Sequence, residues 1–85
     1  MTKGEYRVGI NFNPSNDDTV GQIKRKAADL IDLIDSIDTH TPKQDSDDEW
    51  KRTHEINRLK ALAQTVVEEA AMWAVKAATK PKHEA

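Results

Sequence analysis

The sequence has no cysteine, so neither a disulfide nor a thiolate metal site can stabilise a fold of only 85 residues. Chains this short rarely build enough hydrophobic core alone, and we therefore expect association with other copies. No apolar run approaches the ~20 residues of a transmembrane helix, and the first residues lack the apolar stretch of a signal peptide. These absences predict a soluble intracellular protein that does not contact a membrane.

Groups for catalysis are also scarce. The sequence offers no cysteine nucleophile and no glycine-rich phosphate loop, and its histidines are too scattered to form a helical metal pair. Glu68 and Glu69 diverge by ~100° on a helix, which argues against an acid–base pair. Four aspartates at every third position turn around a helix and do not converge on a metal: Asp29, Asp32, Asp35 and Asp38. We expect a protein that is not an enzyme and has no metal or cofactor.

Positive charge is not in excess, because the formal net charge is −2. Proteins that coat DNA carry a clear positive excess, so we expect no DNA partner. The densest basic cluster is Lys24-Arg25-Lys26, which is either ordinary surface charge or a phosphate site. In the second case Tyr6 or Phe12 would stack on a base.

The first half of the chain predicts an arm and a helix. Residues 1–16 alternate weakly and end in an Asn-Pro-Ser-Asn turn signal, which favours an extended arm lying on other helices. Residues 17–38 predict helix one, with its N-cap at Asp17 or Asp18 and one apolar face of 3.6-residue period. Asp35 and Asp38 lie at the negative end of the helix dipole, so this end is expected to fray or to be balanced by a neighbour.

The second half predicts a polar loop, a long helix and a tail. Pro42 breaks the chain within the loop 39–46, and Ser46 begins a capping box for helix two, residues 47–79. Lys80-Pro81 ends that helix and opens the tail, residues 80–85. We therefore predict one all-α domain, residues 1–85, in which an extended N-terminal arm precedes an antiparallel two-helix hairpin with a long second helix.

Helix two carries two apolar sets. The first follows coiled-coil spacing: Ile56, Leu59, Ala63, Val66, Ala70, Trp73 and Ala77. The second covers another face: Val67, Ala71, Ala74, Val75 and Ala78. A helix that is apolar over most of its circumference must be buried on more than one side, and one partner helix covers only one. The sequence therefore predicts a homo-oligomer. Beside the first set, Arg58 either pairs with a carboxylate such as Glu55 or binds an anionic ligand.

Several stretches together resemble a small phage protein family. They are Tyr6-Arg7-Val8-Gly9, Phe12-Asn13-Pro14-Ser15, Ile23-Lys24, residues 27–32, Arg58-Leu59, residues 61–65 and residues 69–79, the last containing Ala-Met-Trp-Ala-Val-Lys-Ala-Ala. The family is that of the cyclic-oligonucleotide sponges that block CBASS defence in bacteria (anti-CBASS protein two, T-even type). Its helical hairpin domain is shared with a sponge that acts against Thoeris defence.

The resemblance implies a homo-hexamer of helical hairpins in the cytoplasm of the infected bacterial host. It implies sequestration of cyclic dinucleotides and cyclic trinucleotides without cleavage, so that the defence effector is not activated. The residues that match the dinucleotide site are Tyr6 and Lys24, with Lys26 close by, and Arg58 matches the trinucleotide site. The alternatives are an adaptor hairpin that binds a partner protein, a sponge for a cyclic ADP-ribose-type signal, a nucleic-acid-binding regulator and a cyclic-nucleotide hydrolase.

Overall fold

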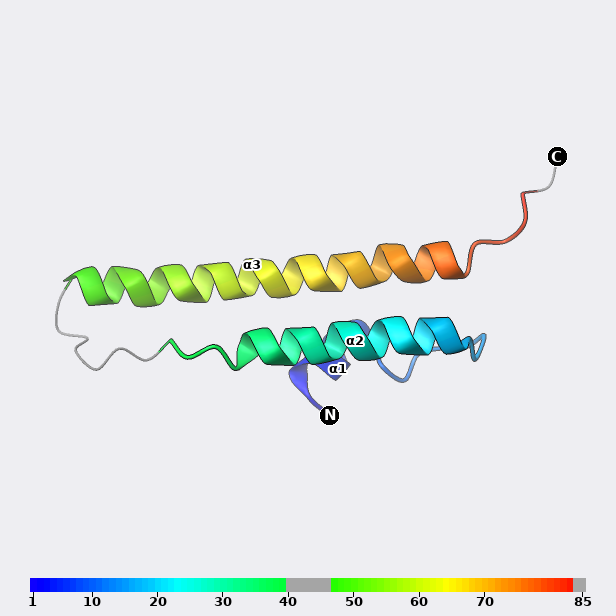
Figure 1. Ribbon diagram of the computed structural model, residues 1–85, viewed down its shortest axis with the longest axis horizontal. Helices are drawn as coiled ribbons and strands as arrows, with labels where there is room; N and C mark the ends of the chain where they lie inside the picture. Colours follow the sequence, from blue (N-terminus) through cyan, green and yellow to red (C-terminus); the bar gives the residue numbers. More distant parts are fainter. Residues whose placement is uncertain (40–46, 84–85) are drawn as a thin grey trace.

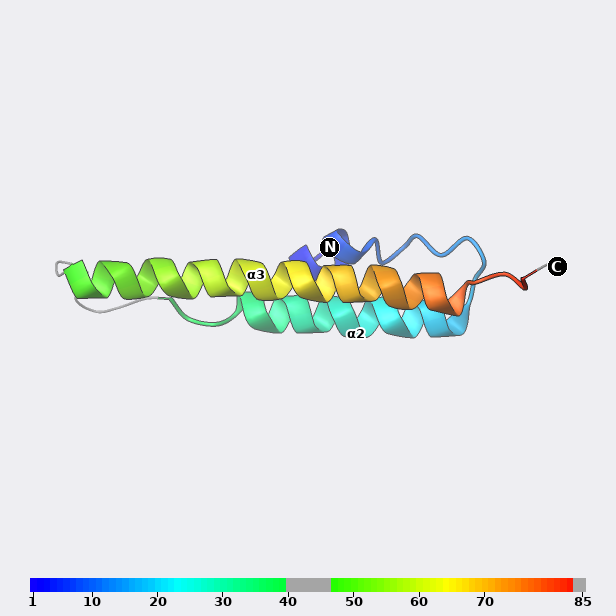
Figure 2. The same ribbon diagram turned by 90° about the horizontal axis from the view of Figure 1, so that it is seen from above.

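The computed structural model describes residues 1–39 and 47–83 of the chain. They form three helices, α1 (Lys3–Val8), α2 (Asp18–Asp35) and α3 (Asp47–Ala78), and no strand. The long helices α2 and α3 run antiparallel and side by side, and the short α1 lies beside the middle of α2 (Figure 1, Figure 2). The all-helical prediction is confirmed for this part of the chain. No described helix combines the length and apolar character needed to span a bilayer.

The prediction of an extended arm is wrong for residues 3–8, which are helical. Thr2 caps this helix through a capping box, in which its hydroxyl accepts from Glu5 N and its own N–H donates to Oε1 of Glu5. Gly9 ends the helix in the left-handed conformation, with φ of 65°, which glycine adopts without steric cost. Caps at both ends therefore stabilise a helix too short to form alone.

Helix α2 begins as the sequence indicates and ends earlier. Asp17 is the N-cap, and its carboxylate accepts from the backbone N–H groups of Thr19 and Val20 at 2.8 and 3.2 Å. The helix ends at Asp35, although the predicted span ran to residue 38. Lys60 of α3 donates to the carbonyl oxygens of Asp35 and Ile37 at 3.0 and 2.7 Å. A neighbouring cation thus balances the negative end of α2, one of the two expected outcomes.

Helix α3 spans Asp47–Ala78, one residue shorter than predicted, and by helical geometry it is roughly 48 Å long. The predicted cap at Ser46 lies outside the described residues. The face that packs on α2 and the arm uses the second apolar set: Ala71 is buried and Val67, Ala74 and Val75 are half-buried.

Much of the first apolar set of α3, the one with coiled-coil spacing, faces outward. Leu59, Val66 and Trp73 are 51%, 60% and 61% exposed, and Leu62 and Met72 beside them are also exposed. The core of one chain is correspondingly small, and its fully buried residues on α2 are Val20, Ala28 and Ile31. One hairpin therefore covers one side of α3 and leaves the other side apolar and open.

Candidate functional site

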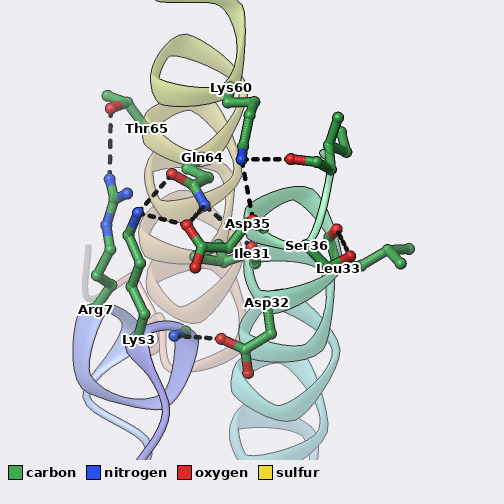
Figure 3. A network of polar contacts seen from close by, with 12 residues as sticks. Lys3, Arg7, Ile31, Asp32, Leu33, Asp35, Ser36, Lys60, Gln64 and Thr65 are labelled. Atoms are coloured by element: carbon green, nitrogen blue, oxygen red, sulfur yellow. Dashed lines mark hydrogen bonds and ion pairs between the residues drawn. The ribbon is translucent and has the colours of Figure 1, made fainter. Parts of the chain in front are cut away.

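A polar network docks α1 onto the hairpin. Gly4 is buried against α2, and its N–H donates to Oδ1 of Asp32 at 2.7 Å. Lys3 donates to Asp35 at 3.0 Å and to Gln64 of α3 at 2.9 Å (Figure 3). The Lys3 ammonium and the Gln64 amide lower the pKa of Asp35, because both stabilise its ionised form.

Gln64 is the centre of that network. Its side chain is almost fully buried, and its amide nitrogen donates to the Ile31 carbonyl and to Asp35, each at 3.2 Å. A buried amide is costly unless it is hydrogen-bonded, and here both ends of the amide have partners. Gln64 therefore ties all three helices together at one point.

Docking of α1 brings Arg7 to α3. Lys3 and Arg7 are four residues apart, so they lie on the same helix face and both reach α3 (Figure 3). The Arg7 Nε–H donates to Oε1 of Glu68 at 2.7 Å, and NH2 donates to the Thr65 hydroxyl at 3.4 Å. This ion pair is largely shielded from solvent, with the two side chains 22% and 34% exposed.

The loop after α1 wraps around Lys24 of α2. Only 7% of Lys24 is exposed, and its ammonium donates to the carbonyl oxygens of Gly9, at 3.0 Å, and Phe12. The same ammonium lies 5.4 Å from the centre of the Phe12 ring, a cation–π separation. Asn13 fixes the rest of the loop by bonding both the N–H and the carbonyl oxygen of Asp17. Lys24 therefore holds the loop in place as well as supplying positive charge.

Two pockets of about 270 Å³ each share Lys24 and Val75. The first, which we call the Arg7 pocket, has a polar side and an apolar side. Its lining residues are Arg7, Lys24 and Glu68 on the polar side and Val8, Ala71, Met72 and Val75 on the apolar side. The second pocket lies toward the 12–15 loop and the end of α3 and has a mostly apolar lining that includes Phe12 and Pro14. Cations beside an apolar surface suit a ligand with phosphates and flat rings.

The predicted dinucleotide-site residues lie in different surroundings. Tyr6 is 77% exposed on α1 and is not among the residues that line either pocket. Lys26 is exposed and borders a separate, mostly apolar hollow between α2 and α3. Of the basic cluster on α2, only Lys24 lines the Arg7 pocket, since successive residues of a helix point in different directions.

Arg25 is held in ion pairs at the surface. It binds Glu5 at 2.9 Å and Asp29 at 2.8 Å, and both contacts raise the pKa of the guanidinium, the Glu5 bond most. The Thr2 backbone N–H, followed by Arg25, lowers the pKa of Glu5 to about 2. These contacts hold the start of α1 against α2.

Arg58 forms an ion pair with Glu55, which was one of the two alternatives that its position beside the first apolar set left open. Its guanidinium contacts Glu55 at 2.6 Å on the exposed surface of α3. This contact raises the pKa of Arg58 and lowers that of Glu55. Arg58 lines neither of the two pockets that include Lys24, so one protomer does not bring the two predicted ligand sites together.

The carboxylates considered for catalysis or metal binding serve the fold. Glu68 accepts from Arg7, while Glu69 accepts from the Trp73 indole at 3.3 Å. Within residues 1–39 and 47–83, no group of three or more histidine or acidic side chains is arranged to hold a metal ion. The predicted divergence of Glu68 and Glu69 is confirmed.

The sequence analysis named Arg7 only within the stretch Tyr6-Arg7-Val8-Gly9 and missed its place beside Lys24. The available signal was the Thr2-to-Glu5 capping pattern, which predicts a helix at residues 3–8 and therefore a shared face for Lys3 and Arg7. Which residues of α3 that face would meet depends on the docking of α1, which no local pattern specifies.

A family model described as the Acb2/Tad1 hairpin domain matches residues 5–79. Neither the curated proteins nor the solved structures contain a significant match. The matched range includes most of α1, all of α2 and all of α3. It therefore contains every residue considered above for ligand binding.

Proposed function

The chain belongs to the Acb2/Tad1 hairpin-domain family, and from that premise we propose that it sequesters cyclic di- and trinucleotide second messengers without cleaving them. The family is one of phage anti-defence sponges for cyclic nucleotide signals. In this proposal the protein acts in the cytoplasm of the infected bacterium and keeps the signal from the effectors of CBASS defence. The family match over residues 5–79 is the observation that carries it.

The chemistry around Lys24 supports dinucleotide binding. Lys24 lines both the Arg7 pocket and the neighbouring pocket at the 12–15 loop, and its ammonium is already fixed in direction by two carbonyl oxygens. A cation that is fixed before binding loses little entropy when a phosphate arrives. Tyr6 is exposed on α1 and available to stack on a base, and Lys26 adds exposed positive charge on α2. We assign these three residues to the dinucleotide site.

We assign Arg58 to the trinucleotide site. It is more than half exposed and pairs with Glu55 at the surface. Such a solvent-exposed pair contributes little stability, so a phosphate that forms a bidentate bond can displace the carboxylate at little cost. In a symmetric assembly each arginine recurs around the axis, which multiplies its attraction for a triply charged ring.

The proposal includes assembly into a homo-hexamer. The outward apolar side of α3, which includes Leu59, Leu62, Val66 and Trp73, supports it, because exposed apolar surface of this kind marks an interaction site. Each pocket has a volume of about 270 Å³, which is small for a cyclic oligonucleotide. Binding sites formed between protomers would supply the remaining volume.

The test is depletion followed by recovery. The protein is mixed with a panel that contains 3′,3′-cyclic diadenylate, a cyclic triadenylate and cyclic ADP-ribose, and free ligand is measured after ultrafiltration. The retained fraction is then heat-denatured and analysed by chromatography. Depletion with recovery of the intact cyclic compound supports the sponge, whereas a linear product would show hydrolysis.

The same panel separates the remaining alternatives. Retention of cyclic ADP-ribose alone would move the assignment to the Thoeris-type signal. Retention of none of the three compounds by a folded protein would favour an adaptor that uses the apolar side of α3 to bind a partner protein.

A further inference from the structure

We propose that Arg7 is a phosphate-binding residue that Glu68 holds in position, and that the ligand's phosphodiester replaces Glu68 as its partner. This inference rests on the proposed function and adds to it a residue, Arg7, and a carboxylate that limits affinity, Glu68. It concerns the Arg7 pocket, where helices α1, α2 and α3 each contribute a charged side chain.

The position of Arg7 is fixed before any ligand binds. The Gly4 N–H on Asp32 and the Lys3 ammonium on Asp35 and Gln64 hold α1 against both long helices. Arg7 lies one turn further along the same face, so it is delivered to the pocket by the backbone of α1 and not by a flexible loop.

The contacts of the Arg7 guanidinium leave donors for a ligand. An arginine has five N–H donors, and the contacts to Glu68 and Thr65 use one on Nε and one on NH2. A phosphodiester has two oxygens with the geometry of a carboxylate, so it can accept two parallel N–H bonds from the guanidinium. Glu68 accepts from Nε alone, so the phosphodiester can replace it.

The charges of the pocket explain why Glu68 matters. Arg7 and Lys24 bring two positive charges and Glu68 brings one negative charge to the lining. In a partly buried site these charges are screened less than at the surface. Glu68 therefore repels an incoming anion while keeping Arg7 aimed at the pocket, and its removal should strengthen anion binding.

The apolar side of the pocket suits the rest of a nucleotide. Val8, Met72 and Val75 provide a surface for a base or a ribose next to the two cations. The volume of about 270 Å³ lies just below the range typical of whole ligands, so the pocket suits a part of the cyclic dinucleotide and not the whole ring.

The experiment compares two substitutions that remove opposite charges from one ion pair. Isothermal titration calorimetry with 3′,3′-cyclic diadenylate is run on full-length wild type, Arg7→Gln and Glu68→Gln. We expect Arg7→Gln to weaken binding about tenfold or more and Glu68→Gln to strengthen it by roughly threefold to tenfold. Glutamine at position 68 still accepts a hydrogen bond from Arg7, so this variant keeps the fold even if Arg7→Gln does not.

Matched controls remove one positive and one negative charge from α3 at positions outside the pocket. Arg52→Gln and Glu69→Gln, both at exposed positions outside the Arg7 pocket, should bind within about twofold of wild type. Thermal unfolding and oligomer size are measured for every variant.

Weaker binding by Arg7→Gln together with tighter binding by Glu68→Gln would support the inference, because loss of a purely structural ion pair changes the affinity in the same direction in both variants. Equal weakening by both variants, or wild-type affinity in Arg7→Gln, would overturn it while leaving the sponge function standing. A folded wild-type protein that binds no cyclic dinucleotide would overturn both the dinucleotide function and this assignment.

Discussion

Replacing Gly4 by alanine tests how α1 is held on the hairpin. A Cβ at this position would lie 2.1 Å from the Ala28 carbonyl oxygen and 2.8 Å from Oδ1 of Asp32. The carbonyl belongs to the backbone of α2 and cannot move aside, so α1 must shift. The shift would lengthen the 2.7 Å bond from the Gly4 N–H to Asp32.

The size of the effect follows from three contributions. Overpacking costs about 1–3 kcal/mol, and loss of a hydrogen bond to a charged group costs about 1.5–3 kcal/mol. Alanine is better than glycine within a helix by about 0.8–1 kcal/mol, which offsets part of the loss. We expect the docking of α1 to weaken by roughly 2–5 kcal/mol, limited by the free energy at which α1 detaches.

Hydrogen exchange of residues 3–8, together with denaturant unfolding, measures this change. The matched control is Gly21→Ala in α2, where the nearest atom to a new Cβ is Nδ2 of Asn13 at 3.9 Å, an ordinary contact. That variant should gain up to about 1 kcal/mol from helix propensity. Unchanged protection of residues 3–8 in Gly4→Ala, with wild-type stability, would refute the docking described for α1.

Three further predictions concern acid stability, the end of α2 and ligand stacking. The Thr2 N–H and then Arg25 lower the pKa of Glu5 from 4.5 to about 2. The ionised form of Glu5 therefore stabilises the fold above pH 4.5, and this contribution is lost as pH falls toward 2. The free energy of unfolding of Glu5→Gln should therefore fall less steeply with decreasing pH than that of wild type. Lys60→Met removes the donor to the Asp35 and Ile37 carbonyls and should cost about 1 kcal/mol in urea unfolding, while no loss would contradict its capping role. Tyr6→Ala should weaken dinucleotide binding without lowering the melting temperature, because the side chain is exposed; unaltered affinity in calorimetry would remove Tyr6 from the site.

The helical hairpin followed from local patterns in the sequence. Asp17 as N-cap and the long apolar span of α3 are set by nearby residues, so cap chemistry and periodicity predict them. The uncompensated acidic end of α2 predicted fraying or a neighbouring cation, and Lys60 is that cation. Its identity could not be predicted, because it depends on the register between α2 and α3.

The arm shows where local patterns are insufficient. Weak alternation and the Asn-Pro-Ser-Asn turn signal favoured an extended segment, whereas the structure has a helix that begins with the capping box of Thr2 and Glu5. Gly4 is needed because the Ala28 carbonyl leaves no room for a side chain, a tertiary reason that is invisible in the sequence. The Arg7 pocket is likewise formed by docking, since Arg7, Lys24 and Glu68 come from three separate helices.

The decisive experiment is native mass spectrometry of the protein with and without cyclic di- and trinucleotides. We expect a homo-hexamer that retains intact cyclic ligands, and the number bound per hexamer would show whether one or two kinds of site exist. A monomer at working concentration would contradict the role given to the apolar side of α3. A hexamer that retains no cyclic nucleotide would contradict the sponge function itself.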